Sequence, residues 1–258
     1  LETTGLQEHA ITGGKLNGGV AARVVIASFT LDNAKRGLGE EMTTDPITYL
    51  VPLSHPESPF CGKWRTIYTR IARALRGKKL AGHHVKFDAR YTYATTGVEL
   101  RKWLYWDTQI SSALLDENNS TALKEVAPRT FGIERWDDVE LKTPGAAERE
   151  PLMKLGEYAA RDTYWGYMLL LNHLDRMQPT EQPFFPDEIE EARLGNLAYW
   201  VAMPTVRTLT GIEERGLLLE NSWVEASMVE LEEQRDSAYD YLIRLYPDSP
   251  EDLEDPDK

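Results

Sequence analysis

The sequence predicts an α/β domain in which helices flank a mixed sheet, followed by a helical C-terminal segment. Two early segments, 20–30 and 47–53, are rich in β-branched residues and bounded by polar turns, as strands are. After residue 60 short strands alternate with helices, and from about residue 150 the apolar residues recur at helical spacing. Strands followed by strand–helix alternation are typical of a mixed sheet with helices on its faces.

The elements after residue 60 follow from apolar spacing and from the residues that interrupt it. In order, we expect a helix at 60–76, a strand at 80–85, a strand at 103–106, a helix at 107–117, a short helix at 121–132 and a long helix at 151–177. Gly77 is expected to end the first of these helices. Pro128 should break the short helix, and 137–147 should form a polar connection.

The composition fits a soluble globular protein. The chain has 258 residues, of which 41% are hydrophobic and 10% aromatic, enough for a proper core. No apolar run approaches the length of a membrane span, so no membrane partner is expected. The single cysteine, Cys61, excludes an internal disulfide and indicates a reducing compartment, which predicts a cytoplasmic protein.

The net charge of −13 is distributed unevenly along the chain. Residues 181–258 carry 20 acidic and 6 basic residues, so this segment contributes −14 and residues 1–180 contribute about +1. Within 61–90, nine Lys and Arg residues accompany a single acid, Asp88. Such a local excess predicts a site for a polyanion, although a solvated basic helix face would leave the same pattern.

Acidic residues in three separate segments could meet in a metal site. Glu2 ends a strand-like stretch in LETTGL, and Asp88 stands at the strand-to-helix junction of GHHVKFD. In EYAARDTYWGY, Tyr158 and Asp162 are four residues apart and project from the same face of a helix. A carboxylate on this helix is costly to bury unless it is paired or binds a metal. Each signal alone also fits an ordinary surface residue.

Taken in order, the three segments resemble the motifs of the 3′–5′ proofreading exonuclease domain of polymerase I-type, or family A, DNA polymerases. Those motifs, D-x-E, N-x-x-x-F/Y-D and Y-x-x-x-D, belong to the wider ribonuclease H-like exonuclease superfamily. The resemblance covers roughly residues 1–175, and 107–133 is similar to the family's segment between the second and third motifs. It implies a ribonuclease H-like fold and hydrolysis of the 3′-terminal phosphodiester of single-stranded or frayed DNA.

The resemblance also implies a two-metal site with a defined set of residues. Mg²⁺ or Mn²⁺ requires oxygen ligands, and two such cations can activate a water and stabilise the leaving 3′ oxygen. Glu2 and Asp162 would hold the metal on the side of the nucleophile. Asp88 would hold the second metal, largely through water, and the Tyr158 hydroxyl would orient the attacking water.

Contacts to the DNA are implied at further positions. Thr3 would touch the terminal nucleotide, and Leu6 would wedge against its base. His84 stands where the family usually has asparagine, so it could contact DNA, ligate a metal or serve a structural role. On a strand, His83 and His84 would point to opposite faces and could not both serve one site. The basic residues expected to contact phosphates are Lys78, Lys79, Lys86 and Arg90.

The C-terminal third resembles the start of the polymerase domain of family A enzymes. Segment 203–234 reads as a helix that stops at Gly216, a short apolar stretch, the acidic Glu220 and another long helix. The family usually has aspartate in place of this glutamate. Asn221 or Ser222 is expected to cap the second helix.

Domain boundaries follow from the same resemblance. We expect an exonuclease domain at 1–178 and the helical start of a polymerase domain at 179–258. The rest of that polymerase domain would follow in the same chain and would be the partner of the exonuclease domain. An aspartate directly before Leu1, on a truncated first strand, would complete the first motif and bridge both cations. Without it, this 258-residue chain is expected to be poorly folded or nearly inactive. The source would be a bacterium or its phage.

Two other functions remain open. A ribonuclease D-type 3′–5′ exoribonuclease shares the three motifs, and 196–245 would then form a helical nucleic-acid-binding domain. A non-catalytic scaffold domain of a polymerase is the second alternative. Such a domain usually loses its carboxylates, whereas this chain keeps Glu2, Asp88 and Asp162.

Overall fold

The computed structural model describes residues 1–3, 23–31, 46–139, 141, 143, 145–179, 194–215 and 220–245. The chain divides into two compact units, Leu1–Glu214 and Arg215–Lys258. The predicted contact residue Leu6 and the expected helix stop at Gly216 lie outside the described residues. So do residues 180–193, close after the predicted domain boundary at residue 178, and this boundary therefore stays a prediction.

An antiparallel sheet and a parallel strand pair form the β part of the first unit. β2 (Val24–Leu31) lies between β1 (Glu2–Thr3) and β3 (Ile47–Pro52) and is antiparallel to both. β4 (Leu80–Gly82) and β5 (Leu104–Asp107) pair in parallel. This combination of antiparallel and parallel strands, together with the helices around them, confirms the predicted mixed α/β class.

Helices make up most of the remaining described residues. In chain order they are η2 (Cys61–Lys63), α1 (Trp64–Ala74), α2 (Val85–Thr96), η3 (Arg101–Trp103), α3 (Thr108–Leu115), α4 (Leu123–Phe131), α5 (Ala146–Arg149), α6 (Leu152–Met177), α7 (Leu194–Leu197), the π-helical η5 (Ala198–Ala202), α8 (Met203–Arg215) and α9 (Asn221–Leu245). The helical C-terminal segment is thereby confirmed. None of the helices in the described ranges is long and apolar enough to cross a bilayer.

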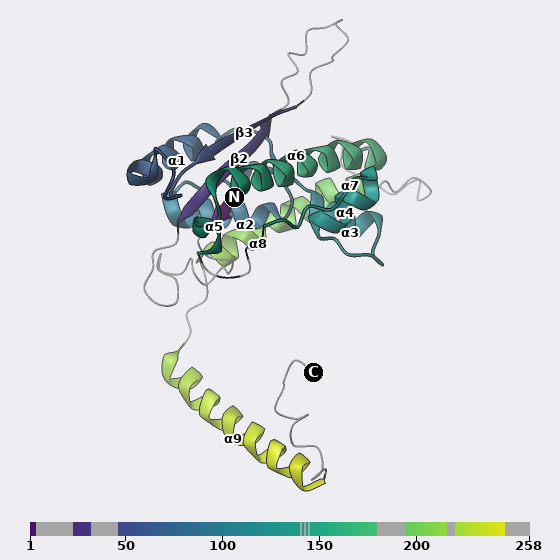
Figure 1. The fold of residues 1–258 in the computed structure, drawn as a ribbon. Coiled ribbons are helices and arrows are strands. Elements are labelled where there is room, and N and C mark those ends of the chain that lie inside the picture. The colour runs from purple at the N-terminus through teal and green to yellow at the C-terminus, as the bar shows by residue number, and fades with distance from the viewer. Residues whose placement is uncertain are drawn as a thin grey trace, which may run out of the picture. The chain divides into compact units, whose positions relative to one another are not determined.

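The long helix α6 organises the first unit. It lies along β2 and β3 of the antiparallel sheet (Figure 1). Pro151 occupies its N-cap position, where its missing N–H removes no helical hydrogen bond, and Gln178 ends it in the left-handed conformation. The helix expected over 151–177 is therefore confirmed.

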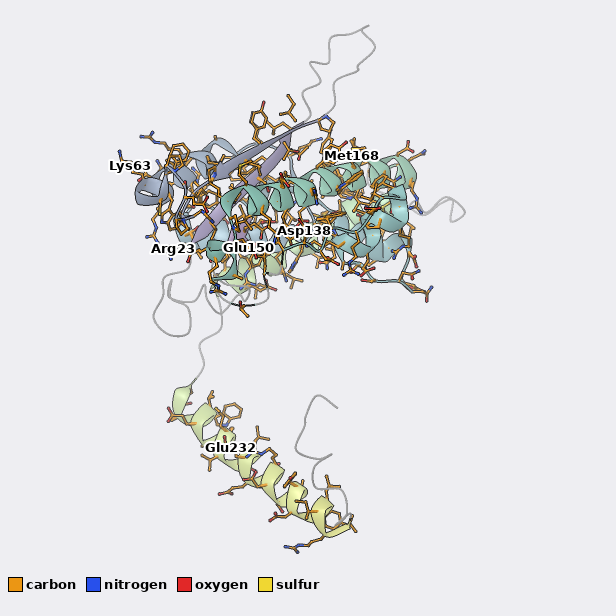
Figure 2. All side chains as sticks on the ribbon, viewed as in Figure 1. Arg23, Lys63, Asp138, Glu150, Met168 and Glu232 are labelled. Atoms are coloured by element: carbon orange, nitrogen blue, oxygen red, sulfur yellow. The ribbon has the colours of Figure 1, made fainter. Side chains whose placement is uncertain are left out.

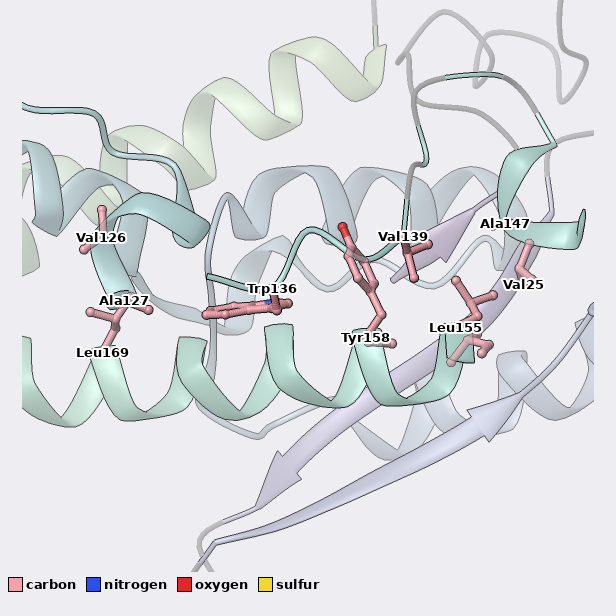
Figure 3. Close-up of a cluster of buried hydrophobic side chains, with 11 residues drawn as sticks. Val25, Val126, Ala127, Trp136, Val139, Ala147, Leu155, Tyr158 and Leu169 are labelled. Atoms are coloured by element: carbon pink, nitrogen blue, oxygen red, sulfur yellow. The ribbon is translucent and has the colours of Figure 1, made fainter. Parts of the chain in front are cut away.

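Two buried clusters enclose β2. Leu155 and Leu169 of α6 belong to the larger cluster, which Val25 joins from β2 (Figure 3). Val24 belongs to a second cluster, together with Tyr68 of α1. Since Val24 and Val25 are both fully buried, β2 is an internal strand that side chains cover on both faces.

The expectation that Pro128 breaks its helix is wrong. Pro128 lies inside α4, which continues to Phe131 and ends at Gly132 with a φ of 67°. The proline removes one backbone donor, but the neighbouring Val126 and Ala127 are buried in the larger cluster. Tertiary packing thus maintains the last turn of α4 despite the proline.

The strand expected at 80–85 is shorter than predicted. It ends at Gly82, and His84 has a positive φ of 60° directly before α2. The Asp107 carboxylate accepts hydrogen bonds from the backbone N–H of His84 at 3.1 Å and of the following residue at 3.0 Å. These bonds turn the chain into the helix, so His83 and His84 do not lie on a strand and do not alternate between its faces, contrary to the prediction.

Candidate active site

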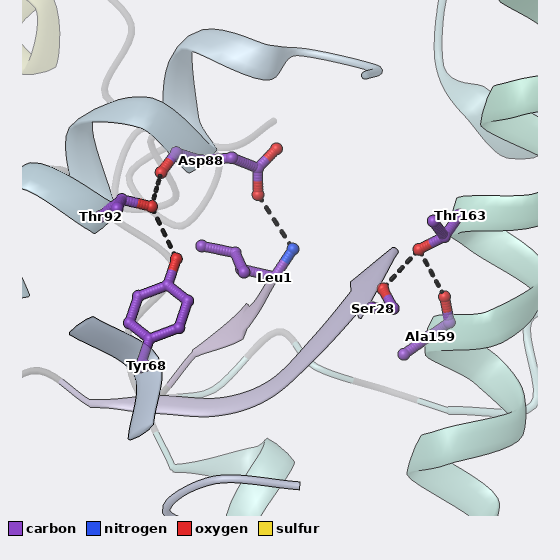
Figure 4. Close-up of polar contacts among 7 residues, drawn as sticks. All are labelled: Leu1, Ser28, Tyr68, Asp88, Thr92, Ala159 and Thr163. Carbon is purple, nitrogen blue, oxygen red and sulfur yellow. Dashed lines mark hydrogen bonds and ion pairs between the residues drawn. The ribbon is translucent and has the colours of Figure 1, made fainter. Parts of the chain in front are cut away.

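Carboxylates from three elements share one region of the first unit. Glu2 lies in β1 opposite Ile26 of β2, Asp88 lies in the first turn of α2, and Asp162 lies in α6. The amino group of Leu1 donates to Asp88 Oδ1 over 2.9 Å (Figure 4). Burial alone would lower the pKa of this amine, but Asp88, Glu2 and Asp162 stabilise its charged form and raise the pKa. These three side chains, here called the acidic cluster, are therefore electrostatic neighbours.

Burial makes two carboxylates of the acidic cluster, those of Glu2 and Asp162, difficult to ionise. The pKa of Glu2 is raised to about 7, first by burial and further by the charges of Asp162 and Asp88. The amine of Leu1 and the Lys124 side chain oppose this increase. Burial also raises the pKa of Asp162. Carboxylates held together in a poorly solvated place cost free energy, and such arrangements are typical of functional sites.

Tyr158 lies one turn before Asp162 on α6 and is only 8% exposed. Figure 3 shows its ring on the same side of α6 as Trp136. Burial raises the pKa of its hydroxyl, and the charges of Asp162 and Glu2 raise it further. The hydroxyl therefore stays protonated at neutral pH and can donate a hydrogen bond.

Lys124 of α4 brings a positive charge to the acidic cluster. Its Nζ donates a hydrogen bond to Tyr158 Oη and lies 3.8 Å from the centre of the Tyr158 ring. The same charge favours ionisation of Glu2 and Asp162. Sequence reasoning missed Lys124, because 34 positions separate it from Tyr158 and no local pattern marks it.

Trp136 supplies a neutral donor to the acidic cluster. Its Nε1 donates to Asp162 Oδ1 over 2.6 Å, and the side chain is 4% exposed. A hydrogen bond to a charged group contributes about 1.5–3 kcal/mol, which offsets part of the cost of burying the carboxylate. No local motif marks Trp136, although tryptophan side chains are highly buried on average.

The ligand chemistry of the acidic cluster fits a divalent metal, whereas its present geometry does not form a complete site. Three carboxylates supply the oxygen ligands that Mg²⁺ and Mn²⁺ prefer. The Lys124 charge, which favours ionisation of Glu2 and Asp162, shows that a cation is stabilised beside the cluster. Even so, within the described ranges no three His, Cys, Asp or Glu side chains are arranged so that they could hold a metal ion.

Two of the predicted phosphate contacts are paired with α8. Lys86 Nζ lies 2.8 Å from Glu213 Oε1, and Arg90 Nη1 lies 3.1 Å from Glu213 Oε2. These pairs join α2, which carries Asp88, to a helix more than a hundred positions away. Contact of Lys86 and Arg90 with DNA stays a prediction, and it would compete with the charge of Glu213.

The other predicted contacts lie at different places on the unit. Thr3 follows Glu2 in β1. The side chain of His84 is exposed at the start of α2, and Lys78 is exposed before β4. Lys79 Nζ lies 4.7 Å from the centre of the Tyr105 ring. Among the predicted residues that the structure describes, Glu2, Asp88, Tyr158 and Asp162 are those that contribute to the electrostatics of the acidic cluster.

The fold and the site define a mixed α/β protein with a partly buried acidic cluster. No protein-family model matches the chain, and no curated protein matches it. A solved structure described as Brucella melitensis NrnC bound to pGG is 18% identical to it, with a TM-score of 0.39. The match covers 53% of this chain and 58% of that chain, so this chain spans just over half the length of that protein. Nothing in these comparisons supports a DNA polymerase.

Proposed function

We propose that this protein is a 3′–5′ exonuclease that hydrolyses the terminal phosphodiester bond of single-stranded nucleic acid. The observation that carries the proposal is the acidic cluster. Glu2, Asp88 and Asp162 come from β1, α2 and α6, and they influence one another's charge beside Tyr158. These are the residues of the three exonuclease motifs, separated in the chain by more than seventy positions each.

Mg²⁺ or Mn²⁺ would be held by Glu2, Asp88 and Asp162, because their oxygens are the ligands that these ions require. Bound there, divalent cations supply an activated water and stabilise the leaving oxygen. Trp136 holds the Asp162 carboxylate in a fixed orientation. A positioned carboxylate reaches a bound ion without losing further side-chain freedom.

Tyr158 is the proposed hydrogen-bond donor of the site. Lys124 Nζ donates to the oxygen of its hydroxyl, so the hydroxyl proton is free to point to another acceptor. A water or a phosphate oxygen beside the acidic cluster would be that acceptor. Lys124 also offsets part of the negative charge that would otherwise repel a polyanionic substrate.

The proofreading domain of a family A polymerase is a narrower candidate. It is motivated by the resemblance of the C-terminal segment to the start of a polymerase domain, for which two helices are expected, and by α8, which ends at Arg215, and α9, which begins at Asn221. A ribonuclease D-type exoribonuclease needs only the acidic cluster and a helical domain after it. Since the comparisons do not support a polymerase, the proposal is made for the exonuclease, with DNA and RNA as substrates to be compared.

The test is shortening of 5′-labelled single-stranded DNA and RNA by the protein in its natural length, with Mg²⁺ or Mn²⁺ present. Products should shorten one nucleotide at a time from the 3′ end. Asp162→Asn should abolish the reaction, whereas Asp175→Asn, on an exposed part of the same helix, should leave it unchanged. Faster removal of a mismatched 3′ end from a DNA duplex would favour the proofreading candidate. If neither nucleic acid is shortened, the scaffold alternative replaces the proposal.

A further inference from the structure

Helix α1 and the turns at its ends present an exposed basic surface on the first unit. We call it the α1 basic surface and define it by Lys63, Arg65, Arg70, Arg73, Arg76, Lys78 and Lys79, all of which are exposed. Figure 2 shows Lys63 at one end of α1, at the margin of the unit. The surface therefore faces solvent along the whole length of the helix.

The amphipathic pattern of α1 sets the direction of these charges. Tyr68 and Ala72 are buried, and Tyr68 Oη shares a hydrogen bond of 2.6 Å with Thr92 Oγ1 of α2. Arg65 and Arg73 are both exposed and lie eight positions apart, so they are separated by about 12 Å along the helix axis. Thr92 lies in α2, which also carries Asp88, so this contact holds α1 against α2. Within α2, Thr92 Oγ1 donates to the backbone oxygen of Asp88 at 2.7 Å.

The charges of the α1 basic surface are not compensated by the described carboxylates, in contrast to several basic residues elsewhere in the unit. In the described part of the chain, no carboxylate forms an ion pair with any of its seven side chains. Lys86 and Arg90 are paired with Glu213, and Arg101 is paired with both Glu99 and Glu214. Carboxylates are abundant in this chain, which carries a net charge of −13, so this uncompensated surface is a local exception.

Aromatic rings accompany the charges. The guanidinium of Arg65 lies 5.5 Å from the centre of the Trp64 ring, and that of Arg76 lies 5.9 Å from the Trp103 ring. Phe60, directly before η2, is 39% exposed. Cations that follow a phosphate backbone, together with exposed rings that can stack on bases, are the usual composition of surfaces that bind single strands without reading their sequence.

We propose that the α1 basic surface binds the sugar–phosphate backbone of single-stranded nucleic acid. The choice of single-stranded nucleic acid as the partner rests on the proposed function. The choice of α1 as the place of binding rests on its uncompensated charge and on the aromatic rings beside it. It keeps the predicted contacts Lys78 and Lys79 and leaves out Lys86 and Arg90, whose charges Glu213 offsets.

The experiment measures binding of fluorescein-labelled oligothymidylate by anisotropy over a range of salt concentrations, in EDTA so that no divalent ion supports hydrolysis. The test variant is Arg65→Gln with Arg73→Gln. The matched control is Lys102→Gln with Lys154→Gln, which removes the same charge from exposed lysines that have carboxylate partners. Thermal unfolding of both variants by circular dichroism verifies that they fold.

The test variant should bind roughly tenfold more weakly than wild type at low salt. The slope of log affinity against log salt should fall by about 1.4, since each lost phosphate contact to a single strand contributes about 0.7. The control should retain the wild-type slope. An unchanged slope in the test variant, equal losses in both variants, tighter binding of duplex than of single strand, or no binding by wild type would each overturn the proposal.

The outcome is separable from that of the nuclease assay. If the protein binds oligothymidylate through Arg65 and Arg73 but shortens no nucleic acid, the proposed function fails and the α1 basic surface stands. If the protein shortens nucleic acid while the test variant binds with the wild-type salt slope, the acidic cluster stands and the α1 basic surface is wrong.

Discussion

His84 is held in a backbone conformation that few side chains accept. Its φ of 60° places it in the left-handed region at the N-cap of α2, and its side chain makes no capping hydrogen bond. Non-glycine residues found in this region are enriched in Asn, Asp and His. The backbone therefore accepts histidine here as it would accept the asparagine of the motif that the sequence resembles, and the predicted contact of His84 with DNA stays a prediction.

A substitution series at His84 tests this explanation. His84→Asn should change the free energy of unfolding by less than about 0.5 kcal/mol, because asparagine also tolerates positive φ. His84→Val should lower it by roughly 1–2 kcal/mol, because a β-branched side chain is strained in the left-handed region. Urea unfolding monitored by circular dichroism measures both. Equal stability of the two variants would contradict the explanation.

At the scale of elements, one buried carboxylate connects the starts of two helices. Asp107 ends β5 and caps α3 by accepting from the backbone N–H groups of Gln109 and Ile110. It also accepts from the N–H groups of His84 and Val85 at the start of α2. Helix N-termini leave these donors without intrahelical partners, so Asp107 satisfies donors of both helices at once.

Replacing Asp107 should therefore be costly. Asp107→Asn should lower the free energy of unfolding by roughly 1–3 kcal/mol, because the amide offers one acceptor oxygen in place of two. Asp107→Ala, which removes every acceptor, should cost more than Asp107→Asn. Asp116→Asn is the matched control, since Asp116 makes its hydrogen bonds on the surface and should cost well under 1 kcal/mol. A control variant as unstable as Asp107→Asn would contradict the capping role.

Individual elements show which features the sequence could predict and which it could not. The helix over 151–177 and the strand at 47–53 repeat their apolar residues at regular spacing, and the structure has them with nearly the same bounds. Asp88 and Asp162 could be singled out because each follows a local pattern. Lys124 and Trp136 could not be placed in this way. Their contacts join residues far apart in the chain, and such contacts form only when the helices pack.

At the scale of the whole molecule, stability should depend on pH through buried histidines. His173 is 1% exposed, and its Nδ1 shares a hydrogen bond of 2.7 Å with Ser111 Oγ. Burial lowers its pKa to about 4, and the charge of Arg176 acts in the same direction. Burial likewise lowers the pKa of His83 to about 4. Both side chains are therefore neutral in the folded protein at neutral pH.

A group with a lowered pKa in the folded state destabilises the protein as the pH falls. Below the unfolded-state pKa of His173, near 6.5, the unfolded chain takes up a proton that the folded chain refuses until about 4. Between pH 7 and pH 5 His173 should thus remove about 2 kcal/mol from the free energy of unfolding. In urea unfolding, the free energy of unfolding of His173→Gln should fall between pH 7 and pH 5 by that much less than the free energy of unfolding of wild type. Between pH 7 and pH 8 the two proteins should change in parallel, and a parallel change at lower pH as well would refute the assignment.

The hydrogen bond from Trp136 Nε1 to Asp162 Oδ1 couples an indole ring to the acidic cluster. Indole fluorescence responds to the charge and hydrogen bonding at its nitrogen, so the emission of Trp136 should report on whatever binds to Asp162. The chain has seven tryptophans, and the difference spectrum between wild type and Trp136→Phe isolates this one. Titration with Mn²⁺ or Mg²⁺ would then be followed by light emitted from the candidate site itself, with no label attached and no turnover required.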